Sequence, residues 1–184
     1  MGELIRPYYL VAIPDGAVVQ DMLRLQKFIS RRFRMYTQPY PSLHLTIGVV
    51  ESGGDIRRTF PALEQIAARH LPLTVRVNGQ RCFDEPFLAV GLAVESRQLA
   101  YLAGEVEGKL SSVGFQLRSF ARWNFHISLV SPLFSRRLWN SSEFHEACQL
   151  TAAHAPDARC TLGKIELWDP EFPPLNLIAR FNSK

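Results

Sequence analysis

The chain divides into short segments with two kinds of apolar spacing. Apolar residues three or four positions apart, typical of helices, occur at 18–29, 60–67, 99–113 and 141–153, and Gly114 is a suitable helix stop. Short apolar or alternating runs, typical of strands, occupy residues 8–14, 43–50, 71–79, 87–94, 124–130, 160–168 and 175–181. The pattern predicts an α+β protein.

The order of these segments repeats. Strand, helix, strand, helix, strand runs from Tyr8 to Val77 and again from Phe87 to Trp168. At matching places the chain reads "RCFDEPFLAVGLAV" and "LWDPEFPPLNLIARF", each with an aromatic residue, an Asp, a nearby Pro and an apolar strand. Repetition of this kind indicates an internal duplication. We therefore expect a single domain over 1–184 with two intertwined lobes, the approximate repeats 8–86 and 87–181.

Each repeat contains one short polar motif inside an apolar strand. Residues 43–47 read "LHLTI" and residues 125–129 read "FHISL". Side chains alternate along a strand, so His44 and Thr46 share one face, as do His126 and Ser128. If the halves pack about a pseudo-two-fold axis, two antiparallel sheets face each other across a central cleft, with the helices outside. The cleft then holds both imidazoles and both hydroxyls.

This set of groups suits phosphodiester chemistry. A neutral imidazole can take a proton from an attacking water or hydroxyl, and a protonated one can give a proton to the leaving oxygen. The hydroxyls of Thr46 and Ser128 can donate to the non-bridging phosphate oxygens. The spacing of His, Cys and carboxylate residues matches no metal-site motif, so neither a metal nor a cofactor is expected. The competing interpretation is a pair of hydrogen-bonded core histidines.

The paired H-x-[ST] motifs in a duplicated α+β frame resemble the 2H phosphoesterase superfamily. This family includes the bacterial LigT-like RNA 2′,3′-cyclic phosphodiesterases, also called 2′-5′ RNA ligases. The resemblance covers nearly the whole chain, from "YYLVAIP" to "LIARF". It implies a bilobal fold with a cleft between the lobes and an active site formed by His44, Thr46, His126 and Ser128. The second motif carries Ser where the first has Thr, which the family pattern allows.

Several residues near the motifs are candidates for substrate binding. Arg118, Arg122 and Trp123 lie in "RSFARW", just before the second histidine strand, and Tyr40 precedes the first. An arginine can contact phosphate and an aromatic ring can stack on a base. The alternatives are solvated surface for the arginines and core packing for the rings.

Composition sets the broad class of protein. The sequence is 47% hydrophobic and 21% charged, which suits a folded domain with an ordinary core, and the net charge of +4 mildly favours an anionic partner. Cys82, Cys148 and Cys160 are scattered and odd in number, so reduced, buried thiols are expected. The "YYLVAI" run is too short for a signal-peptide core or a bilayer span. We expect a cytoplasmic monomer without membrane contact.

Three functions remain open at this point. The first is hydrolysis of 2′,3′-cyclic phosphates at RNA or nucleotide ends by an acid–base pair of histidines. The second is cleavage or joining of 2′,5′ linkages by the same site. The third, from another class, is an RNA-binding module without turnover, although a pure binding groove has no need of two imidazoles.

Overall fold

The computed structural model describes residues 7–118, 125–169 and 176–183. Its elements follow in the order β1 (Tyr8–Asp15), α1 (Val19–Phe33), β2 (Leu45–Ser52), the short 3-10 helix η1 (Ile56–Thr59), α2 (Phe60–His70), β3 (Leu73–Phe83), β4 (Ala89–Glu95), α3 (Arg97–Ser112), β5 (Gln116–Arg118), β6 (His126–Val130), η2 (Pro132–Phe134), α4 (Ser141–His154), β7 (Asp157–Asp169) and β8 (Asn176–Asn182). The predicted α+β class with antiparallel strands is confirmed.

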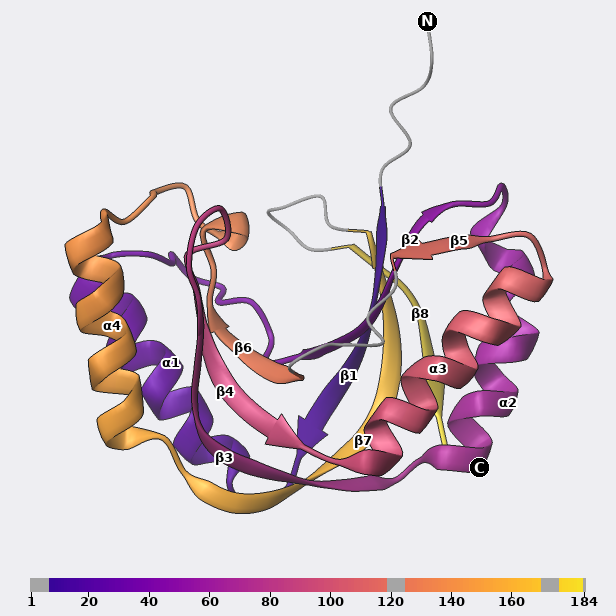
Figure 1. The fold of residues 1–184 in the computed structure, drawn as a ribbon, viewed down its shortest axis with the longest axis horizontal. Coiled ribbons are helices and arrows are strands. Elements are labelled where there is room, and N and C mark those ends of the chain that lie inside the picture. The colour runs from indigo at the N-terminus through magenta and orange to yellow at the C-terminus, as the bar shows by residue number, and fades with distance from the viewer. Residues whose placement is uncertain (1–6, 119–124, 170–175, 184) are drawn as a thin grey trace, which may run out of the picture.

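The described strands form one strongly curled antiparallel sheet (Figure 1). Their order is β5-β2-β1-β7-β3-β4-β6, and β8 pairs with β7 outside this path. The long strand β7 pairs with β1 on one edge, and with β3 and then β8 on the other. The two sheets expected from the sequence are therefore arms of a single sheet, joined through β7.

Two pairs of helices cover the outside of the curled sheet, one pair on each side (Figure 1). The apolar stripes predicted from the sequence provide their contacts. In α3, Leu99, Leu102, Val106 and Leu110 are all buried, and the Ser96 hydroxyl caps the start by accepting from the Leu99 amide at 3.2 Å. Gly114, at φ +92°, follows the end of this helix, as predicted.

The sheet has a helix-covered face and an opposite face. In β1, Leu10 and Ala12 belong to the hydrophobic core, while Val11 is buried on the other side. Val11 pairs with Thr46 of β2 and with Glu166 of β7. Paired residues in an antiparallel ladder point to the same side, so the polar residues Thr46 and Glu166 lie on the face away from the helices.

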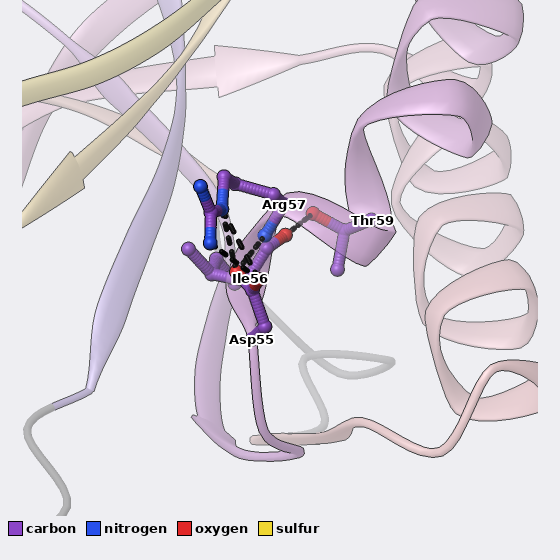
Figure 2. Close-up of polar contacts among 4 residues, drawn as sticks. All are labelled: Asp55, Ile56, Arg57 and Thr59. Carbon is purple, nitrogen blue, oxygen red and sulfur yellow. Dashed lines mark hydrogen bonds and ion pairs between the residues drawn. The ribbon is translucent and has the colours of Figure 1, made fainter.

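A polar turn joins β2 to α2 (Figure 2). The Asp55 carboxylate accepts from the Arg57 amide at 3.1 Å and from its guanidinium at 2.8 Å, and the Thr59 hydroxyl donates to the Ile56 carbonyl at 2.7 Å. These hydrogen bonds hold the pKa of Asp55 below its usual range. They satisfy backbone groups at the start of η1, so the chain can enter α2.

The cysteine expectation is partly wrong. Cys82 of β3 and Cys148 of α4 form a disulfide, which ties the helix to the sheet, whereas Cys160 is a buried free thiol. Sequence spacing could not reveal this pair because the two residues lie 66 positions apart. In the described part of the chain, no helix has the length and apolar character needed to span a membrane.

Candidate active site

His44 lies immediately before β2 and is fixed by its backbone and its ring. Its carbonyl accepts from the Ser128 amide at 2.9 Å, in an isolated antiparallel bridge to β6. Its ring Nδ1 lies 2.8 Å from the Ser42 carbonyl oxygen. A carbonyl can only accept, so Nδ1 carries the proton and Nε2 keeps its lone pair.

Aromatic side chains enclose the His44 imidazole, which is only 3% exposed. The Trp168 ring centroid lies 4.8 Å from that of His44, and the Phe134 ring meets it edge-on at 5.6 Å. This burial lowers the pKa of His44 from 6.5 to about 4; the Ser42 hydrogen bond opposes the shift and repulsion by His126 adds to it. The imidazole is therefore neutral at pH 7.

His126 is the first residue of β6 and is only partly buried. Its ring lies 4.4 Å from that of Phe83, the last residue of β3. On the backbone it pairs with Ala93 of β4. Repulsion by His126 adds a small part to the lowering of the His44 pKa, which is mainly due to burial.

The strand register brings the two motifs together. The bridge sets His44 opposite Ser128, so these side chains share a face, and alternation adds Thr46 and His126 to it. Continuing the antiparallel register by two residues would set Thr46 opposite His126. His44 thus lies opposite Ser128, and the alternation of side chains places all four candidate residues on one face of the sheet.

Gly91 allows β4 and β6 to approach closely beside this surface. It pairs with Ser128, at an irregularity in the β4–β6 register. A Cβ atom at position 91 would lie 2.7 Å from the Ile127 carbonyl oxygen and 3.1 Å from Cδ2 of His126. Any larger residue would push β6 away, and with it the second motif.

Comparisons with known proteins show which solved structures share this fold. No family model and no curated protein matches the sequence, whereas solved structures do. TT0787 of Thermus thermophilus superposes with a TM-score of 0.67 at 14% identity, over 96% of this chain and 97% of that one. E. coli LigT complexed with 3′-AMP gives 0.61 at 14% identity, over 97% and 98%. The chain has the LigT fold. The fold expected from the resemblance to 2H phosphoesterases is therefore confirmed.

The LigT fold also brings to the site residues that the sequence analysis did not assign to it. Trp168 and Phe83 were noted only as markers of the repeat. Each contacts the histidine of the other repeat, so the contacts are crosswise. The matching aromatic positions of the two repeats were visible in the sequence. Which histidine each ring contacts depends on the strand order, which the sequence does not show.

A buried carboxylate supports Trp168. Glu166 is 7% exposed and accepts from the Trp168 indole N–H at 2.8 Å and from Nε of Arg180 at 2.8 Å. A buried carboxylate is stable only when it is paired and hydrogen-bonded. The two donors meet this need, and the bond to the indole fixes the ring that lies against His44.

The structure places two of the four candidate substrate-binding residues. Arg118 of β5 pairs with Glu51 at 2.8 Å, beyond the end of the first motif, so its charge is already engaged. Tyr40 packs against the core and its ring lies 5.8 Å from that of Tyr36. Arg122 and Trp123 lie outside the described residues. The described residues also include no group of three or more His, Cys, Asp or Glu placed to hold a metal ion.

Proposed function

We propose that the protein is a phosphodiesterase that opens 2′,3′-cyclic phosphates of nucleotides or RNA ends without a metal ion. The observation that supports this most is the bridge that sets His44 opposite Ser128, which places both imidazoles and both hydroxyl residues on one face, with His44 held neutral at pH 7. E. coli LigT, with which the chain shares its fold, has been solved with 3′-AMP and with phosphate, which fits a phosphate-containing substrate.

The surroundings of the two histidines divide their roles. His44 presents a neutral Nε2 and acts as the base that takes a proton from the attacking water. The water oxygen bonds to phosphorus, one ribose oxygen leaves, and protonated His126 gives its proton to that oxygen. The product is a phosphomonoester with a free ribose hydroxyl. Thr46 and Ser128 donate to the non-bridging oxygens as charge develops on them.

A bound phosphate changes the protonation of this pair. The pKa of His44 is low because of burial and the nearby His126. A phosphate anion between the rings favours the charged form of each, so it raises the pKa of His44 towards the range in which a base is effective. We therefore expect the acidic limb of kcat to lie at higher pH than that of kcat/KM.

The direct test is hydrolysis of a 2′,3′-cyclic mononucleotide in EDTA, with products separated by chromatography. We expect a phosphomonoester to form, and His44→Ala to remove the activity. Loss of turnover in EDTA with recovery on adding a divalent ion would rule out the metal-free mechanism. Cleavage limited to 2′,5′-linked dinucleotides would reassign the substrate, and binding of RNA without any turnover would support the non-catalytic alternative.

A further inference from the structure

Arg81 lies in the same cross-strand row as Ser128. In the β3–β4 ladder it pairs with Gly91, and Gly91 pairs with Ser128 in the β4–β6 ladder. Since paired residues share a face, the Arg81 side chain is on the motif face of the sheet. The proposed function does not use this residue.

Neighbouring residues confirm the direction of the side chain independently. Cys82 lies on the helix-covered side, because it is bonded to Cys148 of α4. Phe83 is on the opposite side, because its ring contacts His126. Alternation places Arg81 with Phe83, on the side of the candidate active site.

Only a glycine stands between Arg81 and Ser128. The Cα atoms are two strand spacings apart, roughly 10 Å. A long arginine side chain can cross most of that distance, because Gly91 places nothing in its path. The other half provides the contrast: Glu166 is in the same relation to Thr46, but the fully buried Val11 occupies the position between them.

Part of the Arg81 guanidinium has no acceptor among the described residues. Its Nε is buried and has no hydrogen-bond partner there. By contrast, Arg76 of the same strand bonds both oxygens of Asp157 at 2.9 Å, and Arg180 bonds Glu166. Buried donors normally have an acceptor, and one without a protein acceptor is suited to a ligand.

We propose that Arg81 binds the phosphate group of the substrate, beside Ser128. A guanidinium offers parallel N–H donors that match two phosphate oxygens, and this charge-assisted contact is stronger than that of a neutral donor. The inference deepens the proposed function and rests on it. It makes Arg81 a specificity residue for a phosphorylated ligand, while the two histidines carry the proton transfers.

The test is binding of 3′-AMP and of adenosine by calorimetry, to wild type, Arg81→Gln, Arg81→Lys and the control Arg76→Gln. We expect Arg81→Gln to weaken 3′-AMP binding by about 10- to 150-fold, the range for a lost bond to a charged group. Arg81→Lys should lose less, because it keeps the charge without the fork. Adenosine binding and the Arg76→Gln protein should be unchanged.

Three results would overturn the inference: unchanged 3′-AMP affinity in Arg81→Gln, equal losses for 3′-AMP and adenosine, or no 3′-AMP binding by wild type. Thermal melting of each variant monitors folding, and Arg81→Lys replaces Arg81→Gln if the latter does not fold. Turnover separates this inference from the proposed function. A phosphate-specific loss in a protein that hydrolyses no cyclic phosphate would support Arg81 and reject the reaction.

Discussion

His44 and His126 carry the same motif but occupy different surroundings. His44 is 3% exposed, enclosed by Trp168 and Phe134, and bonded to a backbone carbonyl. His126 is more open, at the start of the short strand β6, which ends the strand order. The difference teaches that a repeated motif does not imply repeated surroundings. Burial is the main reason why the pKa of His44 falls to about 4, and this separates the protonation of His44 from that of a solvent-exposed imidazole.

The surroundings also depend on the opposite half of the chain. Trp168 belongs to the second repeat and contacts His44 of the first, whereas Phe83 belongs to the first and contacts His126 of the second. Neither half could form either histidine environment alone. The row beside each hydroxyl residue differs in charge too, with Glu166 on the Thr46 side and Arg81 on the Ser128 side.

The largest effect expected is from removing either imidazole. His44→Ala and His126→Ala should each reduce kcat/KM on a 2′,3′-cyclic mononucleotide by about 10²–10⁴-fold, the usual contribution of one acid or base. The double variant should be far less than multiplicatively worse, because the two groups act as one unit. Near wild-type rates in both folded single variants, checked by circular dichroism, would remove the catalytic assignment.

Removing a hydroxyl should have a smaller effect. Ser128→Ala and Thr46→Val each delete one donor to phosphate, and Thr46→Val keeps the β-branched shape. We expect losses of roughly 10- to 150-fold in kcat/KM, as for a hydrogen bond to a charged group. Equal effects would indicate that the motifs remain equivalent at the phosphate. A much smaller effect of Ser128→Ala would indicate that Arg81 takes over that side.

The contrast in burial predicts a pH effect on stability. The folded-state pKa of His44 is about 4 and its ordinary value is 6.5, so the unfolded chain binds more protons between these values. The contribution of neutral His44 to the free energy of unfolding is complete above about pH 6.5 and is lost as pH falls towards 4. At about 1.4 kcal/mol per pKa unit, the free energy of unfolding should fall by about 3 kcal/mol over this range.

Urea unfolding between pH 4 and 7 measures how the free energy of unfolding depends on pH. His44→Gln is the matched control, since it cannot titrate, and the difference between the two stability curves isolates His44 from the other groups. A parallel dependence of both proteins on pH would show that His44 is not held neutral by burial.

Much of this comparison could be predicted from the sequence, because it depends on local patterns. The spacing of Leu99, Leu102 and Val106 predicted α3, and alternation placed each histidine beside its hydroxyl residue. The face of Arg81 could not be predicted. Val75 and Val77 point to the core, and strict alternation would send residue 81 there as well. A register shift in β3 between Val77 and Gln80, where Gly79 has φ +80°, turns Arg81 to the opposite face.

Contacts between strands distant in sequence were beyond prediction for a similar reason. The Trp168–His44 contact and the Cys82–Cys148 disulfide depend on strand order and curvature. The pairing of Arg118 with Glu51 depends on β5, a three-residue strand too short for any periodic signal. In each case the sequence shows the residue, but it does not show which residue contacts it in the folded protein.

The smallest effect on activity is expected for Trp168→Phe. This substitution tests whether the aromatic ring or its hydrogen bond to Glu166 keeps the pKa of His44 low. The substitution keeps an aromatic ring against His44 but deletes the indole N–H that donates to Glu166 at 2.8 Å. Glu166 keeps its bond to Arg180, so we expect a loss of about 1–3 kcal/mol in the free energy of unfolding, as for a buried carboxylate that loses one donor. Because the ring still excludes water from His44, turnover should stay near wild type, and the NMR titration of His44 should keep its low pKa. Trp168→Ala is the informative partner, since it opens the ring contact as well; it should raise the pKa of His44 towards 6.5 and reduce activity. If Trp168→Phe shifts the His44 titration as far as Trp168→Ala does, the Glu166 hydrogen bond and not burial by the ring sets the protonation of His44.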